Sequence, residues 1–126
     1  MRDSLRLWIG LAAASALGSV AMGAFAAHGV DDPWAKDVLK TGAHYQITHA
    51  LAVFASVWLA ERDQRTGALP AALFLSGTTI FSGSLYAMAF GAPRWLGAIT
   101  PIGGICLMAG WAFLACSAFR RSDNAL

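Results

Sequence analysis

The stretch Ala43-His-Tyr-Gln-Ile-Thr-His-Ala50, followed by ten almost wholly apolar residues up to Ala60, decides the fold of this chain. It is long enough to cross a bilayer, yet its first half carries five polar side chains: His44, Tyr45, Gln46, Thr48 and His49. Hydrocarbon offers these groups no water, so each one that stays unpaired costs several kcal/mol. We therefore expect the other helices to pack around this stretch and to supply its polar partners.

The composition assigns the chain to the membrane proteins. Of its 126 residues, 57% are hydrophobic and only 13% are charged, and the mean hydropathy is +0.56. A soluble domain carries roughly 25% charged residues. The length allows a single domain, residues 1–126. The net charge of +2 comes from short connections, which argues against nucleic-acid binding.

Uninterrupted apolar runs predict an all-α membrane protein with four transmembrane helices in an up-down-up-down bundle. We expect the spans at residues 7–27, 43–60, 68–90 and 100–119. The first run contains Ala24-Phe25-Ala26, which resembles a signal-peptidase site. Its length of about 20 residues exceeds the usual apolar region of a signal peptide, roughly 7–15 residues. We therefore predict that this first helix is retained.

The connections carry helix-start signals. Asp32-Pro33 has the pattern of an N-cap followed by proline at the first helical position, and Thr100-Pro101 repeats it before the fourth span. Because Trp34 and Val38 are four residues apart, we predict a short interfacial helix that leads into the second span. An ordinary polar loop is the alternative.

The basic residues predict the orientation. Six of the nine lie at the N-terminus, in the second connection and at the C-terminus: Arg2, Arg6, Arg62, Arg65, Arg120 and Arg121. The first and third connections hold Lys36, Lys40 and Arg94. Since cytoplasmic segments carry the excess of Lys and Arg, both termini are expected in the cytoplasm.

Polar side chains concentrate in the outer half of the predicted spans. If the second span begins at Ala43, His49 lies about 9 Å below the outer edge. Tyr45 and His49 are four residues apart and Gln46 and His49 three, so we expect them to share a helix face. We expect Ser82, Ser84 or Tyr86 of the third span to hydrogen-bond a neutral His49. The candidate cluster comprises His28, Tyr45, Gln46, His49, Ser82, Ser84, Tyr86 and Thr100.

Three interpretations of this cluster remain open at this point. The side chains tie helices together, or they line a small cavity for a proton, an ion or a lipid-like ligand. In the third, His28 and His49 hold haem or a metal, although no carboxylate stands near them in sequence. No hydrolase, zinc, redox or phosphate-loop motif occurs, and the spans contain no Asp, Glu, Lys or Arg. We therefore predict no catalytic residue, no metal and no cofactor.

Five motifs resemble those of a small bacterial inner-membrane family of unknown function, DUF423. In chain order they are Gly23-Ala-Phe-Ala-Ala-His-Gly29, Tyr45-Gln-Ile-Thr-His-Ala50, Phe81-Ser-Gly-Ser-Leu-Tyr86, Thr100-Pro-Ile-Gly-Gly104 and Ala109-Gly-Trp111. The chain is also similar to a eukaryotic family, transmembrane protein 256. The resemblance implies four retained spans in the cell inner membrane and implies no activity.

These observations predict a non-enzymatic, multi-pass protein surrounded by the lipid bilayer, whose polar cluster binds a small or lipid-like ligand. The alternative is an accessory or assembly subunit of a larger membrane complex, or a protein that associates with itself, in which the same motifs form a contact surface. A membrane enzyme is the least favoured interpretation.

Overall fold

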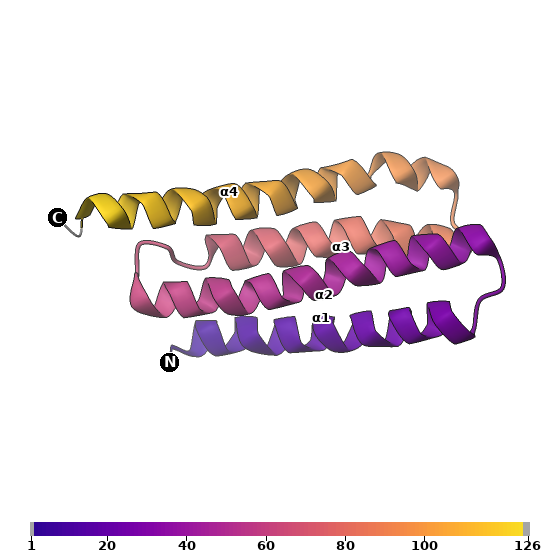
Figure 1. The fold of residues 1–126 in the computed structure, drawn as a ribbon, viewed down its shortest axis with the longest axis horizontal. Helices are drawn as coiled ribbons and strands as arrows, with labels where there is room; N and C mark the ends of the chain where they lie inside the picture. The colour runs from indigo at the N-terminus through magenta and orange to yellow at the C-terminus, as the bar shows by residue number, and fades with distance from the viewer. Residues whose placement is uncertain (1, 125–126) are drawn as a thin grey trace.

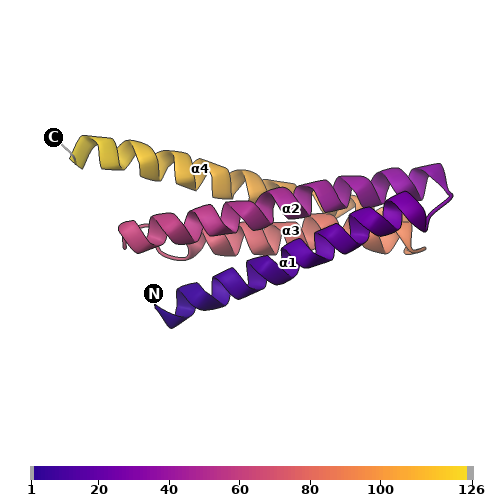
Figure 2. The same ribbon diagram turned by 60° about the horizontal axis from the view of Figure 1, so that its bottom comes forward.

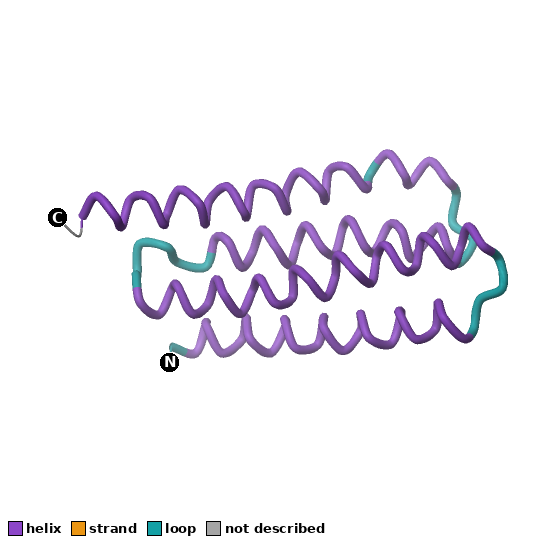
Figure 3. The backbone as a smooth tube through the Cα atoms, viewed as in Figure 1, coloured by secondary structure: helices purple, strands orange, loops and turns teal. Residues whose placement is uncertain are grey.

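The computed structural model describes residues 2–124, which form four α-helices and one short 3₁₀ helix (Figure 1). The α-helices are α1 (Asp3–His28), α2 (Pro33–Arg62), α3 (Leu69–Ala89) and α4 (Thr100–Asn124), and the 3₁₀ helix η1 (Arg94–Ala98) precedes α4. The helices run alternately up and down, so the first turn of α1 and the last turn of α4 lie at the same end (Figure 3). The predicted all-helical bundle is confirmed.

The start of α2 follows from its capping residues. The Asp32 carboxylate accepts a hydrogen bond from the Ala35 N–H at 2.9 Å, and Pro33 stands at the first helical position. The separate interfacial helix that we predicted near Trp34 and Val38 is wrong, because α2 runs without a break from Pro33 to Arg62. No proline follows Pro33 within α2, and Gly42 is buried against α3 rather than ending the helix.

The helix α2 lies at the centre of the packing. Eleven of its 30 residues are buried, against four of 26 in α1, and the extensive contacts join successive helices. In two views, α1 and α4 lie on opposite sides of the α2–α3 pair (Figures 1 and 2). The arrangement is thus more open than a closed four-helix bundle, in which the first and fourth helices are also neighbours.

Small residues set the distances between helices. The buried residues of α1 recur every seventh position, as Leu5, Ala12, Ser19 and Ala26, a spacing typical of left-handed helix packing. Between α3 and α4 the backbones nearly touch, since a Cβ atom on Gly103 would lie 2.5 Å from the Phe81 backbone nitrogen. Fully buried Phe74 fills the centre of the core.

Three segments of the described chain are long and apolar enough to cross a membrane: Asp3–His28, Leu69–Ala89 and Arg94–Arg120. The helix α2 is not among them, because polar residues in its first half lower its hydropathy. It nevertheless runs from the end of the bundle where α1 ends to the end where α3 begins (Figure 1). It therefore crosses the same thickness as its neighbours. Of the five polar side chains in its middle, His49 is buried and Gln46 is partly buried against other helices, whereas His44, Tyr45 and Thr48 are exposed.

A candidate site between α2, α3 and α4

His49 is the buried polar residue at the centre of the candidate site. Its side chain is 6% exposed, its Nδ1 atom lies 2.7 Å from the Tyr45 carbonyl oxygen, and its Nε2 atom lies 3.1 Å from Trp111 Nε1. An indole nitrogen can only donate, so His49 Nε2 accepts from it. The imidazole is then neutral and carries its proton on Nδ1, which donates to the Tyr45 carbonyl. Both ring nitrogens are thereby used.

We predicted that an α3 side chain would hydrogen-bond His49. That prediction is wrong, because the side chain that hydrogen-bonds His49 belongs to α4. The three α3 side chains that we named have other partners. Ser82 donates to the Gly42 carbonyl at 2.7 Å, and Tyr86 donates to Gln46 Oε1 at 2.6 Å. Ser84 donates to the Phe81 carbonyl, so its 2.6 Å contact with Thr100 has the threonine hydroxyl as donor.

Gln46 points to a different side of α2 from His49. Its amide nitrogen donates to the Ser15 hydroxyl of α1 at 3.3 Å, and its amide oxygen accepts the Tyr86 hydroxyl of α3. A glycine makes this possible, since a Cβ atom on Gly42 would lie 2.6 Å from the Tyr86 ring. Gln46 therefore joins three helices through one side chain, and the expectation that it shares a face with His49 is wrong.

Aromatic rings surround His49 and form a groove between α2, α3 and α4. The Tyr45 ring lies 4.4 Å from that of Phe81, and the Trp111 ring lies 4.9 Å from that of Phe74. The groove has a volume of about 380 Å³ and is lined by Tyr45, Thr48, His49, Phe81, Gly104, Leu107, Met108 and Trp111. Tyr45, Met108 and Trp111 are 40%, 65% and 46% exposed, so the groove opens sideways, toward the lipid.

His49 lies far from the end of the bundle at which α2 begins. It stands sixteen residues after Pro33, or ~24 Å along a helix of 30 residues. Its partner Trp111 stands eleven residues after Thr100, ~16 Å from the start of α4. His49 thus lies near the middle of the bundle. Its predicted depth of about 9 Å was counted from Ala43, which stands ten residues after the start of α2, and stays a prediction.

His28 takes no part in this site. It is exposed in the last turn of α1, at the end of the bundle where α2 begins. His49 is ~20 Å or more farther along the bundle axis, so the two histidines cannot bind one metal or haem iron. Within residues 2–120, whose side chains the structure describes, no group of three or more His, Cys, Asp or Glu side chains could hold a metal ion.

Comparison with known proteins identifies the family. Residues 22–104 match the sequence model of the family described as "Protein of unknown function (DUF423)". A membrane protein of the UPF0382 group from Haemophilus influenzae is 41% identical over 119 residues, covering 92% of this chain and 96% of that protein. The Bacillus subtilis membrane protein YwdK and the Escherichia coli K12 inner membrane protein YgdD are each 35% identical, covering 92% and 91% of this chain and 98% and 91% of their own lengths.

The chain belongs to the DUF423 family. It is a membrane protein of that family, as its helices indicate. No solved structure matches the chain.

Most motifs by which the sequence resembles DUF423 lie at helix contacts in the structure. Within Tyr45–Ala50, Gln46 and His49 bind two different neighbouring helices. Phe81–Tyr86 supplies Ser82, Ser84 and Tyr86, and Thr100–Gly104 supplies the close contact at Gly103. Ala109–Trp111 provides Gly110, which meets the Phe74 ring, and Trp111 itself.

Trp111 is the site residue that sequence reasoning on this DUF423 chain missed. Trp111 had no place in our candidate cluster, although its indole N–H needs an acceptor wherever lipid excludes water. Trp111 and His49 fall at comparable distances, ~16 Å and ~24 Å, from the starts of the parallel helices α4 and α2, once α2 is extended to Pro33. An indole can only donate a hydrogen bond and a neutral imidazole can accept one. This complementarity was the signal in the sequence that could have paired Trp111 with His49.

Proposed function

We propose that this DUF423 protein is an inner-membrane protein that holds a lipid-like ligand in the groove between α2, α3 and α4. The observation that carries the proposal is a sideways-open groove whose walls are the rings of Tyr45, Phe81 and Trp111 and whose buried face is His49. Aromatic walls favour a ligand with a flat head, because offset rings attract one another. The E. coli relative is named an inner membrane protein, which supports the location.

The hydrogen-bonding groups of the groove support an amphipathic ligand. His49 uses both ring nitrogens within the protein, so its role is to hold Trp111 in place rather than to bind the ligand directly. Among the described residues, the Tyr45 hydroxyl has no hydrogen-bond partner and is free to donate to a ligand oxygen. Leu107 and Met108 add apolar surface. The groove therefore fits a polar ring joined to an apolar chain.

Filling the groove tests this proposal. Gly104 lines it, and a Cβ atom there would meet the nearest heavy atom, Phe81 Cδ2, only at 3.9 Å. In Gly104→Leu, the new side chain should occupy the ligand's space without disturbing the backbone contact between α3 and α4. Gly83→Leu is the matched control, since Gly83 is an exposed helical glycine of α3 with nothing within 4 Å of its Cβ position.

Both variants and the unchanged protein would be purified gently and extracted with organic solvent for mass spectrometry. We expect one dominant small molecule, near one copy per chain, from the unchanged protein and from Gly83→Leu, and its loss from Gly104→Leu. Equal amounts in all three proteins would contradict the proposal. A protein partner in fixed ratio, with no small molecule, would instead favour a subunit of a larger complex.

The subunit interpretation is the second candidate, and one observation favours it. A groove of about 490 Å³ between α1, α2 and α3 carries Ser15, Gln46, Ser76 and Thr79 among its lining residues. Ser76 and Thr79 are exposed although they lie within α3. Polar side chains at helix surfaces hold transmembrane helices together, so this groove would fit a helix of another subunit.

The orientation belongs to the same proposal, with the end bearing Arg2 and Arg62 in the cytoplasm. Single cysteines would be placed at Asp31 and Gln64, which lie at opposite ends of the bundle, after replacing Cys106 and Cys116 with alanine. In whole cells with a permeable outer membrane, a maleimide that cannot cross the inner membrane should label Asp31→Cys and not Gln64→Cys. The reverse labelling would contradict the orientation.

A further inference from the structure

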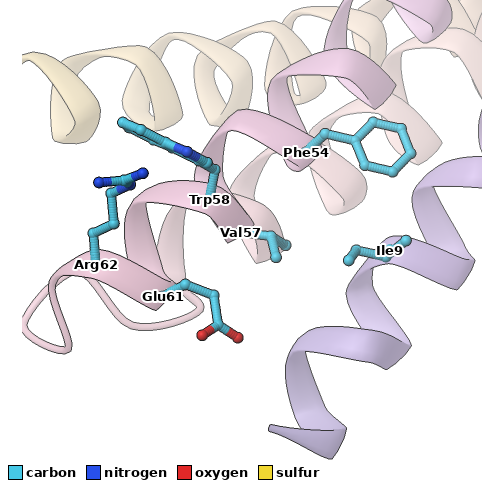
Figure 4. A pocket seen from close by; sticks show the side chains of 6 residues that line it. All are labelled: Ile9, Phe54, Val57, Trp58, Glu61 and Arg62. Atoms are coloured by element: carbon cyan, nitrogen blue, oxygen red, sulfur yellow. The ribbon is translucent and has the colours of Figure 1, made fainter. Parts of the chain in front are cut away.

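A third groove lies at the end of the bundle where α1 begins and α2 ends. It has a volume of about 430 Å³ and is lined by Ile9, Phe54, Val57, Trp58, Glu61 and Arg62. Figure 4 shows Ile9 of α1 facing the apolar side chains of α2, with Trp58, Glu61 and Arg62 toward the end of α2. The groove therefore has an apolar part within the bundle and a charged part at its end.

An arginine is held in place at the charged part of this groove. The Arg62 guanidinium lies over the Trp58 ring at 4.5 Å from its centroid, an arrangement in which the ring face attracts the cation. Trp58 is 57% exposed, as expected for a tryptophan at the level of lipid headgroups. The Glu61 carboxylate points toward the α1 side and away from Arg62, whose guanidinium lies beside Trp58 (Figure 4). The guanidinium edge is therefore open to another anion.

A second guanidinium belongs to Arg2, the N-cap residue of α1. Arg2 Nη2 lies 3.4 Å from the Ala60 carbonyl oxygen, within one turn of Arg62. Ala60 is buried, whereas Arg2 and Arg62 are both exposed. The two arginines, one from each helix that borders the groove, are thus brought to the same end of it.

The charges of the molecule differ between its two ends. Over residues 2–120, this end carries five arginines and three carboxylates, namely Arg2, Arg6, Arg62, Arg65 and Arg120 with Asp3, Glu61 and Asp63. At the opposite end, Lys36, Lys40 and Arg94 are balanced by Asp31, Asp32 and Asp37. The net positive charge therefore lies at the same end of the bundle as the third groove, and this end attracts anions.

We infer that the third groove binds an anionic phospholipid. Its phosphate lies between Arg62 and Arg2, and one acyl chain runs along Ile9, Phe54 and Val57. Basic pockets between transmembrane helices suit such headgroups, because each arginine near the surface adds attraction that zwitterionic lipids do not gain. This inference is independent of the groove that contains His49, because the two grooves share no lining residue and His49 stands thirteen residues, more than three turns, before Arg62.

The test compares two arginine–tryptophan pairs in the same protein. Arg94 lies 4.0 Å over the Trp34 ring at the opposite end, so Arg94→Gln is a matched control for Arg62→Gln. The full chain would be placed in bilayer nanodiscs of phosphatidylcholine with a minor fraction of phosphatidylglycerol. Native mass spectrometry would then measure the ratio of the two lipids that stay bound after the nanodisc is removed.

We expect phosphatidylglycerol to be enriched on the unchanged protein and on Arg94→Gln, and the enrichment to fall about five-fold in Arg62→Gln. Arg2→Gln should act in the same direction, whereas Glu61→Gln should raise the enrichment because it removes a repelling charge. Excess inorganic phosphate should not displace the lipid, since it gains nothing from the apolar walls. No enrichment, an equal fall in Arg94→Gln, or displacement by phosphate alone would overturn the inference.

Discussion

Two polar ties leave different sides of α2 and differ in how many helices they join. Gln46 uses both ends of its amide to join Ser15 of α1 and Tyr86 of α3, so it ties three helices together, although it also lines the groove between them. His49, three residues later, reaches only Trp111 of α4, and both residues line an open groove. The first tie is explained by helix packing alone. The second holds an exposed aromatic ring in place, which packing does not require.

The largest effect on the free energy of unfolding should come from replacing the closely packed glycine beside each tie with alanine. A Cβ atom on Gly110 would lie 2.6 Å from the Phe74 ring, and one on Gly42 would lie 2.6 Å from the Tyr86 ring. Phe74 is fully buried and cannot move aside, whereas Tyr86 is only half-buried. We expect Gly110→Ala to lower the free energy of unfolding by about 2–3 kcal/mol and Gly42→Ala by about 1 kcal/mol.

Titration with SDS in mixed micelles would measure these free energies. Equal losses would show that Phe74 is no more confined than Tyr86. Gly83→Ala, at a position with open space, controls for the intrinsic gain in helix propensity.

Removing the tie made by Gln46 should have the next largest effect. Gln46→Leu leaves the Tyr86 hydroxyl without its acceptor, while Ser15 can turn to a carbonyl of its own helix. We expect a loss of about 1–2 kcal/mol in the free energy of unfolding, by the same titration. The double variant Gln46→Leu with Tyr86→Phe should recover part of that loss, because no buried hydroxyl is then unpaired. A double variant less stable than Gln46→Leu would argue against this bond.

Removing the open tie should cost less. In His49→Leu the indole of Trp111, already 46% exposed, can turn outward toward other partners, so we expect a loss of about 1 kcal/mol or less. The same variant should lose the small molecule that the groove retains, since Trp111 no longer forms its wall. A loss of stability larger than that of Gln46→Leu, with the small molecule retained, would make His49 a packing residue only.

The sequence was sufficient to predict where helices begin, but it was insufficient to predict which helix each side chain contacts. Asp32-Pro33 and Thr100-Pro101 marked helix starts because capping and proline act locally. The continuous α2 helix places Gly42 against the Tyr86 ring, a contact that no local pattern contains. The sequence likewise does not tell which neighbouring helix His49 meets, so α3 side chains took the place of Trp111 in our prediction.

The eight candidate residues show the same division. The structure leaves His28 apart and distributes the other seven over several contacts rather than one pocket. Tyr45 and His49 border the groove, Gln46 and Tyr86 join α1, α2 and α3, and the Ser82, Ser84 and Thr100 hydroxyls tie α3 to α2 and α4. Spacing along one helix shows which residues are neighbours on it. It does not tell which of three surrounding helices each one faces.

Photo-crosslinking in native membranes tests the central claim most directly, by comparing two neighbouring positions of α4. Met108 lines the groove and is 65% exposed, while Ile105 is 62% exposed and does not line it. A diazirine-bearing residue would be placed at each position in turn, irradiated in cells, and the adduct mass determined. We predict one dominant small-molecule adduct at Met108 and a mixture of bulk phospholipids at Ile105. The same phospholipid mixture at both positions would contradict the claim that the groove beside His49 is a binding site.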